Sequence, residues 1–162
     1  MQDFVHLHVH TQYSLLDGQA SVARLVDKAM QNGMKGIAVT DHGNMFGIKE
    51  FTNYVNKKNS GPKGEIKDLK KRLVGIEAGS IECEDKEAEV AACKAKIVEA
   101  ENKLFKPIIG CEMYVARRTM DLKEGKQDQS GYHLIVLAKN ETGYHNLIKF
   151  CLLYTSDAAD ER

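Results

Sequence analysis

The stretch that most constrains the fold is "FVHLHVHTQYSLLDG", which runs from residue 4 to residue 18. Apolar and polar side chains alternate strictly from residue 5 to residue 10, and a period of two is typical of a β-strand. Three of the six histidines of the chain fall here, at His6, His8 and His10. Side chains two positions apart on a strand point to one face, so this stretch predicts a strand with a row of imidazoles.

The segments that follow predict an α/β fold. "ASVARLVDKAMQNG" has an apolar helical stripe that begins after the candidate N-cap Ser21 and can end at Gly33. "GIAVTDHGN" predicts a short buried strand, and a helix over about 45–57 follows it. This alternation is typical of parallel strands with helices outside, where chemistry gathers at the carboxyl ends of the strands. His10 and His42 both lie at such ends.

Residues 59–105 differ from the rest of the chain, because they are rich in Lys and Glu and poor in aromatic residues. "EIKDLKKRLVGIEA" and "DKEAEVAACKAKIVEAENKL" both have helical periodicity. We therefore expect a charged, partly exposed helical hairpin that turns at Gly79-Ser80. The strand pattern resumes in "KPIIGCEMYVA" and "YHLIVLAKN", on either side of a polar loop over 117–131.

The composition of the chain argues against a strongly basic nucleic-acid-binding protein, a secreted protein and a membrane protein. Basic and acidic residues balance at 23 each, so the chain has no overall positive field that would indicate nucleic-acid binding. The four cysteines form no C-x-x-C pair, and the chain opens without a basic and apolar leader. No run approaches the roughly 18 apolar residues of a membrane span. We expect a cytoplasmic protein that does not contact a membrane.

His8 and His10 can reach one metal ion together, because they share a strand face. Imidazole nitrogens and carboxylate oxygens are the usual ligands of Zn²⁺ and related ions. A single H-x-H is weak evidence by itself, since a polar strand face can carry histidines for other reasons. Other residues whose side chains can bind metal lie in a glycine-terminated turn, at the end of the next predicted strand, and in or beside two later strands. These further candidates are Asp17, Asp41, His42, Glu112 and His133.

Several of these residues have alternative interpretations. His6 precedes the H-x-H pair, and an edge-facing or supporting position is as good an interpretation as metal ligation. Asp41 can accept a hydrogen bond from a ligand histidine instead of binding metal. Glu112 would be costly to bury unpaired, which favours a metal ion or a histidine as its partner. Glu77 and His145 are predicted to be solvated or surface residues.

Four stretches, "HLHVHTQYSLLDG", "AVTDHGNMFG", "KPIIGCEMYVA" and "YHLIVLAKNETGYHNL", together resemble the amino-terminal PHP (polymerase and histidinol phosphatase) domain of bacterial DNA polymerase III alpha subunits. The resemblance runs from about Phe4 to Phe150, and 59–105 interrupts it. That insertion is similar to the insertion of Bacteroides-group polymerases. The H-x-H motif indicates only the superfamily, whereas "YSLLDG", "GCEMYV" and "LAKNETGYHNL" are similar to the polymerase branch.

The resemblance implies a fold and a site. The fold is α/β: an incomplete PHP-type distorted (β/α)7 barrel with an inserted helical hairpin. The site is a cluster of two or three divalent ions, Zn or Mn, which suits phosphoester hydrolysis. Some PHP domains of polymerases are metal-dependent exonucleases, and others only support the polymerase and its proofreading partner. The metal positions implied are His8, His10, Asp17, His42, Glu112 and His133, with His6 and Asp41 left as supporting or uncertain residues.

The implied parent protein is a replicative DNA-directed DNA polymerase, a nucleotidyltransferase with Mg at its polymerase site. Its partners would be DNA and dNTPs, a proofreading exonuclease subunit and a sliding clamp. The polymerase domains and the family's last Asp and His ligands have no counterpart here, so we expect the piece alone to be inactive. The alternatives are a stand-alone, histidinol-phosphatase-like PHP phosphoesterase and a non-catalytic docking module for the exonuclease.

Residues 151–162 depart from the family pattern. Back-translated, Cys151 to Glu161 can be written as a transposase-type sequencing adapter. We therefore interpret residues 1–150 as a partial PHP domain and residues 151–162 as an adapter-derived tail. A divergent amphipathic tail is the alternative. Under the first interpretation, the helix before the tail and the edge of the sheet should leave apolar surface exposed.

Overall fold

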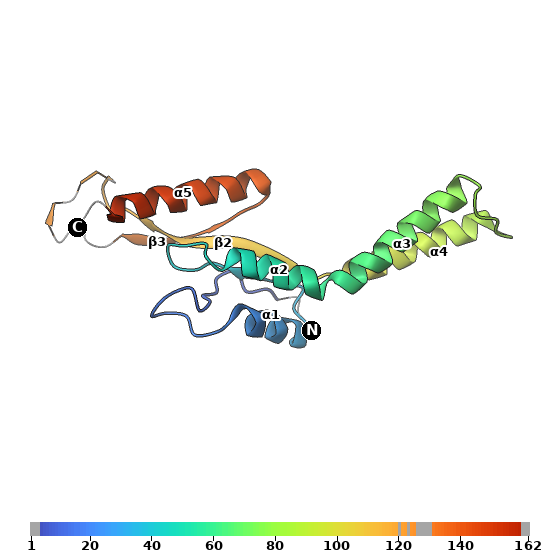
Figure 1. The fold of residues 1–162 in the computed structure, drawn as a ribbon, viewed down its shortest axis with the longest axis horizontal. Coiled ribbons are helices and arrows are strands. Elements are labelled where there is room, and N and C mark those ends of the chain that lie inside the picture. The colour runs from blue at the N-terminus through green and yellow to red at the C-terminus, as the bar shows by residue number, and fades with distance from the viewer. Residues whose placement is uncertain (1–3, 120, 123, 126–130, 160–162) are drawn as a thin grey trace. The chain divides into compact units, whose positions relative to one another are not determined.

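The structure is a computed structural model that describes residues 4–119, 121–122, 124–125 and 131–159, with side chains as far as residue 152. The chain divides into two compact units. The first combines Met1–Tyr54 with Pro107–Arg162, and the second is Val55–Lys106. The described elements, in chain order, are α1 (Val22–Gln31), β1 (Gly36–Val39), α2 (Ile48–Lys58), α3 (Ser60–Glu77), α4 (Lys86–Asn102), β2 (Lys106–Val115), β3 (Tyr132–Leu137) and α5 (Glu141–Ala159) (Figure 1).

The first unit is built on a three-stranded sheet in the order β1-β2-β3. β2 and β3 are antiparallel, and their register places Glu112 opposite Ile135 and Tyr114 opposite His133. A parallel bridge joins His42, just beyond β1, to Glu112. The sheet therefore brings together residues from three distant segments of the chain.

The N-terminal segment is not the regular strand that its alternation predicts. The segment bends at Leu7 and runs beside β1 without forming a strand. The carbonyl of His6 accepts from the Ala38 N–H and that of Val9 accepts from the Thr40 N–H, both at 2.9 Å. Three residues on one side thus face two on the other, which breaks the period of two and separates His6 from His8 and His10, which both face Glu112.

Helices α1 and α2 supply much of the apolar core of this unit. Val22 and Val26 of α1 and Phe51 of α2 are completely buried. Ser21 precedes α1 as predicted, but its side chain makes no capping hydrogen bond. α2 begins at Ile48, later than predicted, because the Asn44 Oδ1 accepts from the Phe46 N–H at 3.1 Å and holds a turn there.

The two faces of the β2–β3 pair have different neighbours. Cys111 packs in a buried cluster with Leu147 and Cys151 of α5, and the partly buried Met113 and Val136 lie against this cluster. Glu112 and Tyr114, at the alternate positions of β2, point to the opposite face. The strand period thus separates an apolar face under α5 from a polar face that carries the site.

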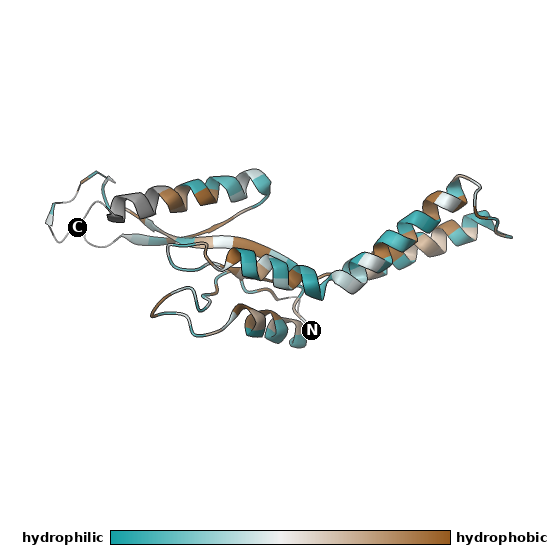
Figure 2. Cartoon of the chain, viewed as in Figure 1, coloured by the Kyte–Doolittle hydropathy of each residue, from teal (hydrophilic) through white to brown (hydrophobic). Residues whose placement is uncertain are grey.

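The second unit contains a helical hairpin where the sequence predicts one. α3 and α4 lie side by side, with hydrophilic and hydrophobic residues interspersed along both (Figures 1 and 2). The turn between them includes Gly79, whose φ of 73° lies in the left-handed region. At the base, the Asn59 side chain donates to the Phe105 carbonyl at 2.8 Å and accepts from the Phe105 N–H at 2.9 Å.

The mixed architecture confirms the α/β class, and the (β/α)7 barrel remains a prediction. α5 runs on through the predicted tail as far as Ala159, whereas residues 160–162 and residues 126–130 of the predicted polar loop lie outside the described residues. In the helix before the predicted tail, Phe150 is 59% exposed as expected, whereas Leu147, which was expected to share the exposed apolar stripe, is buried against Cys111. Among the helices that the structure describes, none combines the length and hydropathy that a membrane-spanning segment requires.

Candidate metal centre

Glu112 lies at the centre of a cluster of imidazoles. Its Oε2 atom is 2.6 Å from His10 Nε2, and its Oε1 atom is 2.8 Å from His133 Nδ1. His8 Nε2 and His42 Nδ1 each lie 4.0 Å from Oε2. The carboxylate is almost fully buried, so these contacts replace the hydration that it would have in the unfolded chain.

The electrostatics of the cluster favour the ionised form of Glu112. Burial is the largest single influence and by itself raises the pKa of the carboxyl group. The hydrogen bond from His10 and the charges of His42, His10 and His133 act in the opposite direction and outweigh it. The pKa of Glu112 consequently lies below its ordinary value, and the group is a carboxylate near neutral pH.

Asp17 reaches the cluster through His42. The Asp17 Oδ2 atom is 2.9 Å from His42 Nδ1. The turn that presents Asp17 is tight, because the N–H groups of Asp17 and Gly18 both donate to the Ser14 carbonyl. A Cβ atom on Gly18 would lie 1.8 Å from the Thr11 carbonyl oxygen, so only glycine fits at this position.

The buried side chain of Asp41 holds this turn in place through hydrogen bonds. Its carboxylate is 1% exposed and accepts from the Thr11 N–H at 2.6 Å and the Thr11 hydroxyl at 2.8 Å. It also accepts from the Ser14 hydroxyl at 2.8 Å, and the same hydroxyl accepts from the His42 N–H at 3.0 Å. Within the described residues, Asp41 therefore bonds to Thr11 and Ser14, and not to a ligand histidine as the sequence suggested.

The three N-terminal histidines have different surroundings. His8 Nδ1 lies 2.9 Å from the Thr40 hydroxyl, and its Nε2 faces Glu112. His10 bonds to Glu112 directly. The ring of His6 instead meets the ring of Phe4 edge-on, with centroids 4.7 Å apart. The bend at Leu7 accounts for this separation of His6 from the other two.

The donor atoms form three overlapping groups that could hold metal ions. Each group has its donor atoms within 4.8 Å of one another, and His10, His42 and Glu112 each belong to two groups. His42 Nε2 is buried and has no hydrogen-bond partner among the residues that the structure describes. A buried imidazole nitrogen without a partner fits a metal ligand, since the lone pair would otherwise be left unsatisfied. The groups are His8, His10 and Glu112; His10, Asp17 and His42; and His42, Glu112 and His133.

The structure adds residues that the sequence did not single out. Thr40 orients His8, and Thr11 and Ser14 link Asp41 to the turn that carries Asp17. Tyr114 stacks on His42 with ring centroids 4.7 Å apart. Its position two residues after Glu112 was the available signal, because strand alternation places both side chains on one face.

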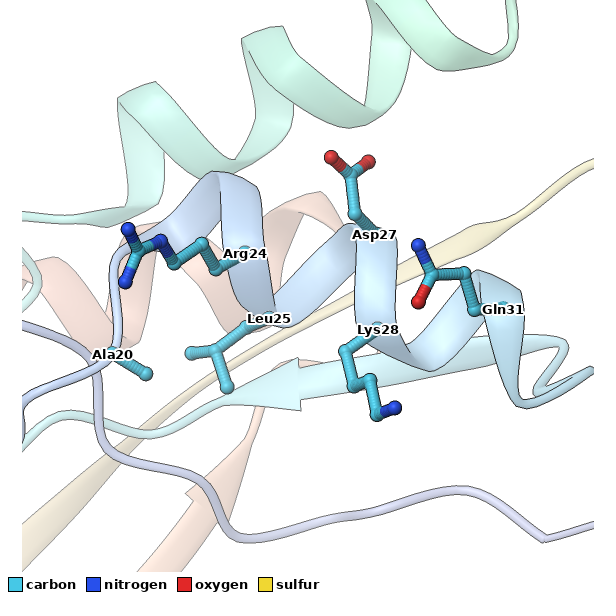
Figure 3. A pocket seen from close by; sticks show the side chains of 6 residues that line it. All are labelled: Ala20, Arg24, Leu25, Asp27, Lys28 and Gln31. Atoms are coloured by element: carbon cyan, nitrogen blue, oxygen red, sulfur yellow. The ribbon is translucent and has the colours of Figure 1, made fainter.

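A surface depression elsewhere does not belong to the site. Its lining side chains all come from α1 and the residue Ala20 before it, as Figure 3 shows. They include charged groups of both signs, Arg24, Asp27 and Lys28. None of the predicted metal positions lines this depression.

The fold and the cluster together define an α/β domain that carries a group of histidines and carboxylates, a candidate metal centre, on one face of its sheet. The PHP domain family matches residues 6–97 and 89–159, and the chain belongs to this family. The chain is 40% identical to the DNA polymerase III subunit alpha of Treponema pallidum over 146 residues, and 38% identical to that of Borreliella burgdorferi over 149 residues. Each alignment covers 90% of this chain and 9% of the relative.

A third relative, the DNA polymerase III subunit alpha of Aquifex aeolicus, is 32% identical over 158 residues, which cover 94% of this chain. These matches confirm the predicted resemblance to the PHP domain of this polymerase subunit, and they do not favour a stand-alone phosphatase. The chain spans about a tenth of the length of these relatives.

Proposed function

We propose that the cluster binds two or three divalent ions, Zn²⁺ or Mn²⁺, as the metal centre of a replicative polymerase's PHP domain. The ligand types are those that such ions take, and the cluster combines four imidazoles with two carboxylates. The ligands proposed are His8, His10, Asp17, His42, Glu112 and His133.

The observation that carries this proposal is the buried Nε2 atom of His42, which lacks a hydrogen-bond partner in the described part of the chain. The other ring nitrogen, Nδ1, faces the Asp17 carboxylate at 2.9 Å. A carboxylate at Nδ1 fixes the tautomer with hydrogen on that nitrogen and leaves the lone pair on Nε2. His133 is oriented in the same way, because its Nδ1 faces Glu112.

The residues of the site also fit a phosphoester as the ligand class. When bound, divalent ions activate water and neutralise phosphate oxygens. Glu112 supplies a buried negative charge beneath the imidazoles and keeps them oriented through His10 and His133. His8, Asp17 and His133 have side chains that are about half exposed, which leaves the cluster open to a ligand from solvent.

We infer that the whole protein is a DNA-directed DNA polymerase that uses Mg²⁺, with DNA and dNTPs as substrates, in the cytoplasm. The names of the relatives support this inference, as does the coverage of this chain by their alignments. A proofreading exonuclease subunit and a sliding clamp are the partners proposed. A metal-free docking module for the exonuclease is the second candidate.

Metal content separates these candidates. We expect the full-length protein that carries this domain to retain Zn or Mn after dialysis, and its His8→Ala/His10→Ala double variant to lose most of it. His145→Ala is the matched control, since this histidine lies on α5 with a side chain 62% exposed. Equal metal in the wild type and the double variant would contradict the proposal, and absence of metal from both would favour the docking module.

A further inference from the structure

Tyr114 contacts two of the proposed ligands through its ring. The ring stacks on His42 with centroids 4.7 Å apart and planes inclined by 25°. It meets His133 edge-on, with centroids 4.9 Å apart and planes at 89°. His42 and His133 also meet each other at 4.8 Å and 75°. The three rings therefore form one mutually packed group, which we call the ring triad.

The three residues of the ring triad come from three separate segments of the chain. Tyr114 lies on β2, and the strand register places it directly opposite His133 of β3. His42 follows β1 and is joined to β2 by the parallel bridge to Glu112. Tyr114 is 37% exposed, so the ring triad is partly accessible to solvent.

A carboxylate alone does not fix the plane of an imidazole. His42 Nδ1 faces the Asp17 carboxylate at 2.9 Å, and His133 Nδ1 faces the Glu112 carboxylate at 2.8 Å. One such bond sets the direction of the nitrogen but permits the ring to tilt about it. Contact with the face or the edge of a second aromatic ring removes that freedom, because stacked and edge-on pairs have preferred geometries.

We propose that Tyr114 is a positioning residue, which holds the imidazole planes of His42 and His133 so that one nitrogen of each ring can bind the same divalent ion; donor atoms of these two histidines and of Glu112 lie within 4.8 Å of one another. This inference rests on the proposed metal-binding function. It assigns the role to the ring and not to the phenol hydroxyl, because the contacts with both histidines are made by the ring. Supporting residues around metal ligands typically change metal affinity by about 10-fold to 100-fold when they are removed.

The test is a Co²⁺ titration of the full chain, followed by visible absorption, which reports both affinity and ligand geometry. We expect Tyr114→Leu to weaken Co²⁺ binding by about 10-fold and to alter the absorption spectrum. Tyr114→Phe keeps the ring and should bind Co²⁺ like the wild type. Tyr132→Leu is the matched control, since Tyr132 lies on β3 and its ring contacts Arg117 instead of a histidine.

A second measurement does not depend on metal. In the metal-free chain, the ring protons of His42 and His133 should lose the part of their ring-current shifts that Tyr114 causes in Tyr114→Leu and keep it in Tyr114→Phe. The positioning role is overturned if Tyr114→Leu binds Co²⁺ with wild-type affinity and spectrum, or if Tyr114→Phe is as weak as Tyr114→Leu. A wild-type chain that keeps the ring-current shifts but binds no Co²⁺ would instead overturn the metal function itself.

Discussion

His10 Nε2 and Glu112 Oε2 lie 2.6 Å apart, although 102 positions separate the two residues in the sequence. This bond ties the N-terminal segment to β2 at the point where the histidine cluster forms. Because Glu112 is also bonded to His133, one carboxylate joins three segments of the chain. The same group therefore contributes to both the stability of the fold and the geometry of the site.

The first prediction concerns the pH dependence of this carboxylate. We expect Glu112→Gln to lower the free energy of unfolding of the metal-free chain by about 2 kcal/mol at neutral pH. The folded pKa of Glu112 lies below its ordinary value of 4.5, so its stabilising contribution is present above that value and disappears as pH falls through the lowered pKa. Urea denaturation across pH measures this. A wild-type advantage that persists well below the lowered pKa would contradict it.

The second prediction concerns the buried carboxylate of Asp41. Asp41→Ala leaves the Thr11 N–H and the hydroxyls of Thr11 and Ser14 without their acceptor, and each unsatisfied buried group is costly. We expect the free energy of unfolding to fall by about 3 kcal/mol. Asp68→Ala on the exposed side of α3 is the control and should change it by less than about 0.5 kcal/mol. Equal effects of the two variants would show that the Asp41 bonds are not stabilising.

The third prediction compares two glycines. Gly18→Ala forces a Cβ against the Thr11 carbonyl oxygen, so the turn that carries Asp17 must move. We expect lower thermal stability and weaker metal retention together. Gly64→Ala in α3 meets no described atom within 4 Å and should stabilise the helix by about 0.5–1 kcal/mol. A calorimetric scan and metal analysis of both variants would check this, and a Gly18→Ala variant that matches the wild type in both would refute it.

The fourth prediction concerns the interpretation of residues 151–162. Cys151 packs against Cys111 and Leu147, whereas Leu152 is 63% exposed. If the tail is adapter-derived, nothing selected it to stabilise the domain, so deleting residues 151–162 should scarcely change the melting temperature. Leu147→Ala, in the native part of the same helix, should cost about 2–4 kcal/mol. A cooperative melt that falls by several degrees on truncation would show that the tail is native structure.

The sequence predicts helices and ligand types better than it predicts the path of the first segment. The charged hairpin and α1 follow from helical periodicity, because those patterns are local. The irregular segment around Leu7 does not follow from its alternation, since hydrogen bonds to β1 break the period. The central place of Glu112 and the contacts of Tyr114 also depend on strand pairing between distant segments, which spacing along the chain does not encode.

Asn59 holds the two ends of the helical hairpin in the second unit together. Its side chain bonds to both the N–H and the carbonyl of Phe105, so the first and last residues of 60–104 are held close together. The entropic cost of closing a chain grows only slowly with its length once its ends are held together. We therefore expect that the hairpin can be replaced. A shorter helical pair, a reporter domain or an affinity module could be inserted between Asn59 and Phe105 without altering any residue of the histidine cluster.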